Sequence, residues 1–262
     1  MALSGDRINE KGIFAGKRAL VVGGSGGIGR AVALGLAVRG SDVTITGGNS
    51  KDRLEQTLAE LNDVSSSGGR EPKNSGFLCK IGTSGGGLSP QEAAGYILKS
   101  GSPDILVVSW GPFKKSTLKD TSPKDWHFLA ENNLIFPGIM VSLVLGDMMA
   151  KKWGRILLFG GTKTAEIRGF LDTAAYGAAK TALGSLVKSA AKSVQNTDIS
   201  CNMICPGITA TEYSDPAELD YFRKKGSGEV LSVQDVAGCA LAVLESPVLN
   251  GAIIPADSGL WV

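Results

Sequence analysis

The stretch that decides the fold is Val21-Val-Gly-Gly-Ser-Gly-Gly-Ile-Gly-Arg30. It follows an apolar run, residues 18–22, that is typical of a buried strand, and it leads into a small-residue helix pattern over 28–39 that ends at Gly40. Glycines at such a junction allow a tight turn and let the backbone approach a pyrophosphate at the positive end of the helix. Because both flanking elements are predicted, the loop indicates dinucleotide binding rather than a turn without a ligand.

The rest of the chain repeats this alternation of strand and helix. Further strands are expected at 42–46, 76–81, 104–109, 155–159, 198–204 and 251–255, and helices at 51–61, from 90, from 123 to about 152 with a bend near Pro137, at 173–194 and from a capping box at Ser232. The order is typical of a parallel sheet with helices on both faces. Residues 1–262 are therefore expected to form one α/β domain of Rossmann type, with a doubly wound parallel sheet.

Composition narrows the class of partner. A net charge of +2 gives no electrostatic reason to expect nucleic acid or an anionic membrane as a partner. The longest uncharged apolar run, 134–146, is too short to span a bilayer, and residues 1–16 show no secretory signal. The four cysteines and one histidine lack disulfide or zinc spacing, so we expect free thiols, no metal and a cytoplasmic protein.

A second motif is Tyr176-Gly-Ala-Ala-Lys180, in the first turns of a predicted helix. Residues four apart share a helix face, so the ammonium group can lie near the phenol. A free tyrosine has a pKa of about 10, and a nearby cation is what lets it act as acid or base near neutrality. Alone, such a pair is usually solvated; its place after the fifth strand of a dinucleotide-binding fold makes it a candidate catalytic pair.

With both motifs present, the chain resembles the short-chain dehydrogenase/reductase family over nearly its whole length. Further matches are Asn133 in the long helix, the run Asn202-Met-Ile-Cys-Pro-Gly-Ile-Thr-Ala-Thr211 after the sixth strand, and the closing Asp257-Ser-Gly259. Singly, Asn133 fits a helix kink and the Pro-Gly pair fits a turn. Their order along the chain is what matches the family.

The resemblance implies roles for these residues. Tyr176 would exchange a proton with the substrate oxygen, Lys180 would lower the pKa of Tyr176 and hold the nicotinamide ribose, and Asn133 would place a water in the proton relay. Thr209 and Thr211 would contact the nicotinamide. The expected cofactor-binding residues are Gly23, Ser25, Gly27, Ile28, Gly29, Asn49, Gly111, Lys180, Pro206, Gly207, Thr209 and Thr211.

The chain departs from the family at the serine that hydrogen-bonds the substrate oxygen. In the family this serine lies just after the fifth strand and thirteen residues before the tyrosine. The spacing from Tyr176 places it at Lys163, whereas the spacing from the start of the fifth strand places it at Gly161. Thr162 lies one position from either count and is the expected replacement, with Thr164 as the alternative. A threonine hydroxyl donates the same hydrogen bond, although these threonines would also serve simply to complete a turn.

The adenosine side of the cofactor site departs as well. In the family, Asn-Asn-Ala-Gly follows the fourth strand; here residues 108–111 take that place, with Trp110 at the third position. Lys80 stands where the family has an aspartate after the third strand, and Val22 stands where the family's glycine motif begins with a threonine. Trp110 would either stack on a flat ligand or fill a pocket. These changes predict weaker binding of the dinucleotide, an altered pose, or no binding.

The end of the second strand bears on the choice of dinucleotide. The carboxylate that would hold the ribose hydroxyls of NAD is missing from 46–51. Nothing there repels a 2′-phosphate, and Asn49, Ser50, Lys51 and Arg30 are possible donors to one, which favours NADP(H) over NAD(H).

Two functions follow. The first is an NADP(H)-dependent oxidoreductase that moves hydride between the nicotinamide and a small-molecule carbonyl or secondary alcohol, with Tyr176 as the general acid or base. The second is a binding or scaffold protein of the same fold with little or no turnover. For either one, the resemblance implies a homodimer or homotetramer assembled through the long helices.

Overall fold

The computed structural model describes residues 12–83, 86–225 and 230–259. Most of residues 1–16, where no secretory signal was expected, lies outside the described residues. The strands are β1 (Arg18–Val22), β2 (Asp42–Gly47), β3 (Ser75–Leu78), β4 (Ile105–Val108), β5 (Trp153–Phe159), β6 (Asp198–Pro206) and β7 (Ile253–Ala256). They form one sheet in the order β3-β2-β1-β4-β5-β6-β7, in which neighbouring strands pair in parallel.

The strand order reverses between β1 and β4, which sets the place of the site. Val22, the last residue of β1, pairs with Thr46 of β2 on one side and with Val108 of β4 on the other. In open α/β sheets, ligands bind beyond the carboxyl ends of the strands at this switch point. The glycine loop leaves β1 there.

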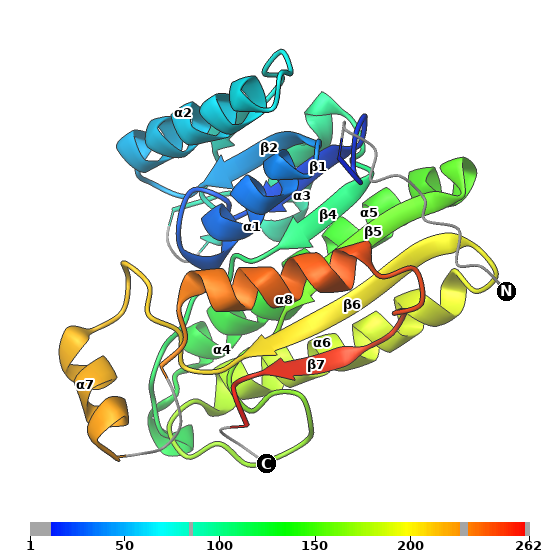
Figure 1. The fold of residues 1–262 in the computed structure, drawn as a ribbon. Coiled ribbons are helices and arrows are strands. Elements are labelled where there is room, and N and C mark those ends of the chain that lie inside the picture. The colour runs from blue at the N-terminus through cyan, green and yellow to red at the C-terminus, as the bar shows by residue number, and fades with distance from the viewer. Residues whose placement is uncertain (1–11, 84–85, 226–229, 260–262) are drawn as a thin grey trace, which may run out of the picture.

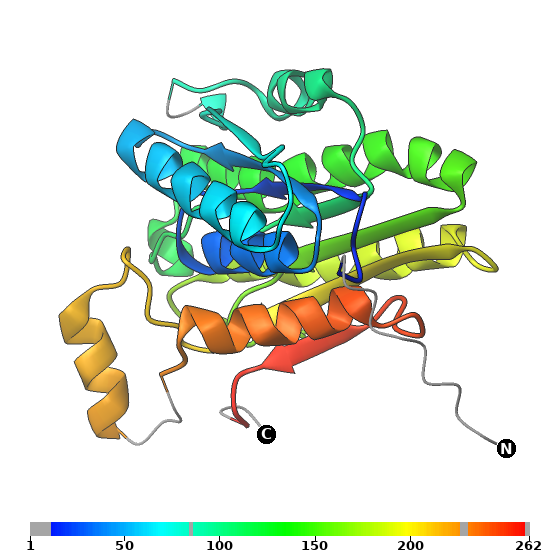
Figure 2. The same ribbon diagram turned by 45° about the horizontal axis from the view of Figure 1, so that its top comes forward.

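Helices cover both faces of the sheet (Figure 1). They are α1 (Gly27–Val38), α2 (Lys51–Ser67), α3 (Pro90–Ile97), α4 (Pro123–Ala130), α5 (Phe136–Lys151), α6 (Ala174–Ser193), α7 (Pro216–Lys225) and α8 (Val233–Glu245). Helices α1, α2 and α8 lie on one face, with α3, α5 and α6 on the other, while α7 stands away from the sheet (Figure 2). The doubly wound α/β class is confirmed.

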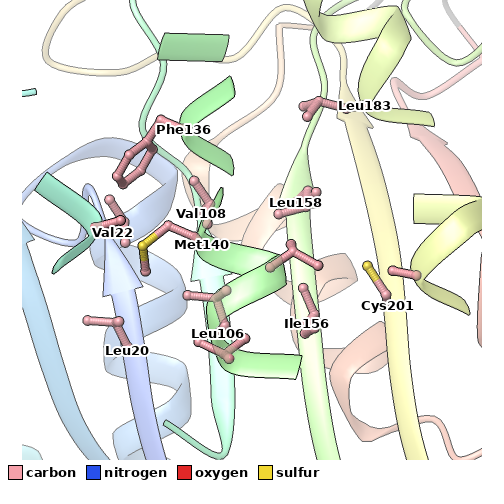
Figure 3. Packing of buried hydrophobic residues seen from close by; sticks show 14 of the residues in the cluster. Leu20, Val22, Leu106, Val108, Phe136, Met140, Ile156, Leu158, Leu183 and Cys201 are labelled. Atoms are coloured by element: carbon pink, nitrogen blue, oxygen red, sulfur yellow. The ribbon is translucent and has the colours of Figure 1, made fainter. Parts of the chain in front are cut away.

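The core consists of two apolar clusters, one on each face. Alternate residues of β1 illustrate the division: Leu20 and Val22 belong to the cluster under α3, α5 and α6, and Val21 to the cluster under α1 and α8. Figure 3 shows the first cluster, with Phe136 and Met140 of α5 packed over the strands. Cys201 and Cys205 lie in that same cluster, as their spacing of four in a strand predicts, and both are free thiols.

Two element boundaries differ from those the sequence predicts. Helix α2 continues to Ser67, although a loop was expected from residue 63. Side chains beyond the helix hold the extra turns: Asn74 donates to the Leu61 carbonyl at 3.0 Å and to the Ser65 hydroxyl at 3.0 Å. Strand β3 is correspondingly short, covering 75–78 instead of 76–81.

The long helix is interrupted where a bend was expected. A π-helical segment, η4 (Glu131–Ile135), joins α4 to α5, and the Phe136 N–H donates to the Glu131 carbonyl five residues back. Pro137 follows at once, and it lacks the N–H that an α-helix would donate to the Asn133 carbonyl. The irregularity therefore falls at Asn133, a predicted site residue.

Residues 123–151 form the single stretch of the described chain that is long and apolar enough to cross a membrane by length and composition alone. The buried side of α5, which includes Phe136, Met140, Val144 and Met148, packs on the sheet. The packing of α5 on the sheet therefore accounts for the apolar composition of this stretch.

Candidate active site

The glycine loop has the close approaches that its sequence predicts. Gly23 adopts φ 81° and Gly27 φ 51°, a left-handed region that favours glycine. A Cβ on Gly29 would clash with the Gly23 carbonyl and the Ser109 hydroxyl, so the absence of a side chain allows α1 to pack closely against β1. Ile28 packs on the core cluster of the α1 face, and Ser25 is buried beside Gly47.

The N-terminus of α1 already holds a negative charge. Both carboxylate oxygens of Glu212 accept hydrogen bonds from the Gly27 N–H, at 2.9 and 3.1 Å. Helix N-termini bind anions through free N–H groups and the helix dipole. The carboxylate thus stands where a pyrophosphate would be expected, and its presence shows that this turn of backbone accepts an anionic group.

Tyr176, Lys180 and Asn133 come together at the carboxyl edge of the sheet. The Lys180 ammonium donates to the Phe159 carbonyl at 2.8 Å and lies 6.0 Å from the centre of the Tyr176 ring. A Cβ on Gly111 would lie 2.9 Å from the Lys180 Nζ and would clash with the Asn133 Oδ1, so the two side chains adjoin the same glycine. Asn133 is fully buried and donates to the Pro112 carbonyl at 3.0 Å.

Two features of this cluster point toward a ligand. The buried Asn133 Oδ1 has no hydrogen-bond partner in the described chain, although an unpaired buried acceptor costs about 1–3 kcal/mol. Lys180 is 3% exposed, and its ammonium, which carries three donors, has one hydrogen-bond acceptor among the described residues, the Phe159 carbonyl. Both groups have unused hydrogen-bonding capacity beside Gly111.

Burial controls the pKa values of the pair. It raises the pKa of the Tyr176 hydroxyl above its ordinary value of 10.0, and the neighbouring Cys205 acts in the same direction. It lowers the pKa of Lys180 to about 8. The resemblance implies that Lys180 lowers the pKa of Tyr176; desolvation acts on the phenol in the opposite direction and favours its protonated form.

The residue that faces the Tyr176 hydroxyl is Gly161. A Cβ added there would lie 2.7 Å from the phenol oxygen and 2.9 Å from Cε1 of the ring. The Tyr176 ring also meets Phe113 edge-on, with ring centroids 5.0 Å apart. Of the two counts made from the sequence, the one from the strand start therefore reaches the residue that lies against the phenol.

Neither threonine occupies that place. Thr162 donates to the Pro206 carbonyl at 3.2 Å, and Thr164 is buried and hydrogen-bonds the backbone of Gly161, donating to its carbonyl at 2.9 Å and accepting from its N–H at 2.8 Å. The two additional residues are accommodated in a tight turn with Lys163 at φ 67°. In this turn Gly161, rather than the hydroxyl of either threonine, therefore lies against the phenol.

The segment after β6 lies against the glycine loop. The Gly207 N–H donates to the Ala256 carbonyl of β7 at 2.9 Å, and the Thr209 hydroxyl donates to the Gly207 carbonyl at 3.1 Å. A Cβ on Gly27 would meet the Thr211 methyl group at 3.6 Å. Pro206, Gly207, Thr209 and Thr211 thus line the same edge as the loop.

The altered adenosine-side residues have structural roles. Trp110 packs edge-on to Phe136 with centroids 6.4 Å apart, so it fills the core of that face. Thr46 of β2 accepts from the Gly23 N–H at 3.2 Å, which braces the loop that begins after Val22. Lys80 is exposed at the end of its strand.

The residues expected to donate hydrogen bonds to a 2′-phosphate differ in whether their side chains are already engaged by other residues. Arg30 forms an ion pair with Glu60, and the Ser50 hydroxyl caps α2 by accepting from the Arg53 N–H at 3.3 Å. Lys51 lies 3.3 Å from Glu55 in an exposed pair, which is worth little. Asn49 is exposed at the end of β2.

Sequence reasoning missed Glu212 and Phe113. Glu212 lies 185 residues along the chain from Gly27, and its position just after Thr211 is the one feature of the sequence that could have pointed to the site. Phe113 follows Gly111 by two residues, a position that carries no chemical signature by itself.

The fold is that of a doubly wound α/β protein of Rossmann type. The family model for short chain dehydrogenases matches residues 17–221, which is most of the chain. The protein belongs to the short-chain dehydrogenase family.

Individual relatives agree with this assignment. The chain is 28% identical over 259 residues to the 3-oxoacyl-acyl-carrier-protein reductase FabG of Escherichia coli, covering 95% of this chain and 99% of that protein. It is 30% identical over 262 residues to the short chain dehydrogenase/reductase dpchG of Colletotrichum higginsianum, covering 94% of each. A solved structure from Agrobacterium tumefaciens with bound NADP superposes with a TM-score of 0.77 at 25% identity, covering 96% of this chain and 98% of that one.

Proposed function

We propose that the protein is an NADP(H)-dependent oxidoreductase that interconverts a small-molecule carbonyl and the corresponding secondary alcohol. The observation that carries the proposal is the meeting of Tyr176, Lys180 and Asn133 at the edge of the sheet where the glycine loop leaves β1. The bound nicotinamide would supply the hydride; the protein supplies position, a proton and electrostatics.

The chain's own residues take the following parts in the proposal. The Tyr176 hydroxyl faces the open side of Gly161 and would donate its proton to the substrate oxygen. Lys180 would hold the nicotinamide ribose, and Asn133, with its unpaired Oδ1, would order the water that resupplies the proton. Glycines 23, 27 and 29 would bring the backbone against the pyrophosphate once Glu212 has left the Gly27 N–H.

The raised pKa of Tyr176 favours the direction of reduction. A protonated phenol is the form required to donate to a carbonyl oxygen, whereas alcohol oxidation needs the phenolate as a base. The glycine at 161 leaves the substrate oxygen without the hydroxyl donor that the family provides, and losing such a donor typically costs about 10²–10³ in kcat. We therefore expect slow carbonyl reduction near neutral pH.

The preference for NADP(H) rests on the end of β2. Asn49 is exposed there and no carboxylate stands at the position that would hold ribose hydroxyls or repel a 2′-phosphate. The similar solved structure from Agrobacterium tumefaciens holds NADP. Arg30 is engaged by Glu60, so Asn49 and the first turn of α2 would meet the phosphate.

A screen of carbonyl substrates with NADPH and NADH tests the function, with Tyr176→Phe as the decisive variant. Removal of the proton donor should lower turnover by about 10²–10⁴ while NADPH binding is retained. Tyr96→Phe is the matched control, because Tyr96 of α3 packs its ring on Phe77 at the β3 edge of the sheet. Equal turnover by Tyr176→Phe and the control would reject the role of Tyr176.

The second candidate is a binding or scaffold protein with little turnover. It is favoured by Gly161, which lacks the family's hydroxyl, and by Glu212, which occupies the N-terminus of α1. Titration with NADPH and NADH, followed by nicotinamide fluorescence, separates the two. Saturable binding of either supports the oxidoreductase, and silence with both supports the scaffold.

We also propose that the protein assembles as a homodimer or homotetramer through α5. The outer side of the helix exposes Leu143 and Met149, and a groove of about 560 Å³ lined by Leu134, Ile139 and Leu186, among others, runs beside it. A helix that is apolar on both sides is normally covered on both. A second copy would cover the outer side.

A further inference from the structure

The start of α1 is capped from a distance. Its own N-cap residue, Gly26, offers no side-chain hydrogen bond, and the first turn contains no acidic residue. The Glu212 carboxylate supplies both missing features when it accepts from the Gly27 N–H at 2.9 and 3.1 Å. A helix N-terminus without a local cap is thereby stabilised by a group that belongs to another segment.

Tyr213 extends the same contact. A Cβ on Gly26 would run into the Tyr213 hydroxyl, so the ring lies directly over the glycine loop. The guanidinium of Arg53, on the first turn of α2, stands 4.8 Å from the centre of that ring. Burial and the charge of Glu212 both raise the pKa of Tyr213, which fits the close packing of the two side chains.

The segment has its own internal support. The Ser214 hydroxyl accepts from the Thr211 N–H at 3.0 Å, and the Thr211 hydroxyl accepts from the Tyr213 N–H at 3.2 Å. The turn therefore presents Glu212 and Tyr213 together to the loop. It is followed by α7, which stands away from the sheet (Figure 2).

We propose that Glu212 and Tyr213 form an internal plug of the glycine loop, which must leave before a dinucleotide binds. This rests on the proposed function, since it assigns the Gly27 N–H to the pyrophosphate. The carboxylate and a phosphate oxygen need the same N–H group, so the two occupants exclude one another. The dinucleotide binds only those molecules in which the plug is displaced, so its apparent dissociation constant is the intrinsic constant divided by that fraction of molecules.

The test measures dissociation constants for NADPH and NADH with the wild-type protein, Glu212→Gln and Glu218→Gln. Glutamine keeps the size of the side chain and removes its charge, so Glu212→Gln should bind about tenfold more tightly, at the low end for a charge-assisted hydrogen bond because the contact is exposed. Glu218 lies six residues further on and pairs with Lys115, so its variant controls for the loss of a carboxylate from the segment. It should bind as the wild type does.

The outcomes separate the plug from the proposed function. Equal or weaker binding by Glu212→Gln would overturn the plug while leaving dinucleotide binding in place. If no variant binds either dinucleotide, the proposed function fails, and the Gly27 amide resonance, followed during titration with inorganic pyrophosphate, decides the plug by itself. If pyrophosphate shifts the Gly27 amide resonance in Glu212→Gln but not in the wild type, the plug is supported. If the resonance behaves in the same way in both proteins, the plug is rejected.

Discussion

Restoring the family's hydroxyl at Gly161 should harm this protein. In Gly161→Ser, the new Cβ would lie 2.7 Å from the Tyr176 oxygen and 2.9 Å from its Cε1, closer than a carbon atom can approach. The Tyr176 ring cannot retreat freely because Phe113 packs edge-on against it. The serine therefore displaces the phenol.

The size of the effect follows from this overlap. Overpacking of a well-packed site costs about 1–3 kcal/mol, and for a protein of this size each kcal/mol lowers Tm by about 2–4 °C. Moving a catalytic group by about 1 Å lowers turnover by about 10²-fold. We therefore expect Gly161→Ser to lose both several degrees of Tm and most of its activity.

Thermal unfolding and steady-state reduction of the best substrate provide the assay, with Gly169→Ser as the matched control. Gly169 is exposed on the same loop, and a Cβ there meets nothing within 4 Å, so its variant should resemble the wild type in both measurements. Gly161→Ser with the Tm of the control and a higher kcat would show that the turn readily accepts a serine. In that case the reasoning from the Cβ position would be wrong.

Three further predictions concern stability, cofactor choice and assembly. Lys180, with a pKa near 8 when folded and 10.5 when unfolded, should add about 3 kcal/mol to the free energy of unfolding between pH 8 and 10.5, because the unfolded chain then binds more protons at this residue. The raised pKa values of the Cys201 and Cys205 thiols act in the opposite direction, so the measurement is the difference in urea unfolding between the wild type and Lys180→Met, which should grow by that amount as the pH rises. Asn49→Asp should lower the affinity for NADPH about tenfold relative to NADH in fluorescence titrations, by repelling the 2′-phosphate, and an unchanged ratio would contradict the proposed site. Leu143→Glu should convert the oligomer to a monomer in sedimentation, whereas a wild-type protein that is already monomeric would remove the basis for assembly through α5.

The parts of the fold that the sequence predicted are those specified by neighbouring residues. The β1–α1 junction, the start of α3, the capping box of α8 and the apolar strands each have a local signal that packing then confirms. The end of α2 was misplaced because serines and aspartate disfavour a helix interior. Its last turns are held by Asn74, a tertiary contact that local preference cannot reveal.

The same distinction applies to the site. Tyr176 and Lys180 were found because a spacing of four on a helix fixes their proximity. The turn at 161–164 left Gly161, Thr162 and Thr164 as alternatives, since the direction of each side chain depends on the left-handed residue between the threonines. The Glu212 contact joins residues 185 apart, and exposed carboxylates carry no signal of what they will meet.

The energetic cost of the site argues for a ligand. Asn133 is buried with its Oδ1 unpaired, the buried Lys180 ammonium uses one of its three donors, and the lowered pKa of Lys180 indicates that the surroundings oppose its charge. Apolar residues of similar size would make a scaffold more stable, since replacing a buried charge by a packed hydrophobic side chain is often neutral or favourable. Gly161 and Glu212 reduce donation to the substrate and access for the cofactor, but neither relieves that cost. A molecule that pairs the Lys180 ammonium and the Asn133 carbonyl oxygen does relieve it, and this is why we favour the oxidoreductase over the scaffold.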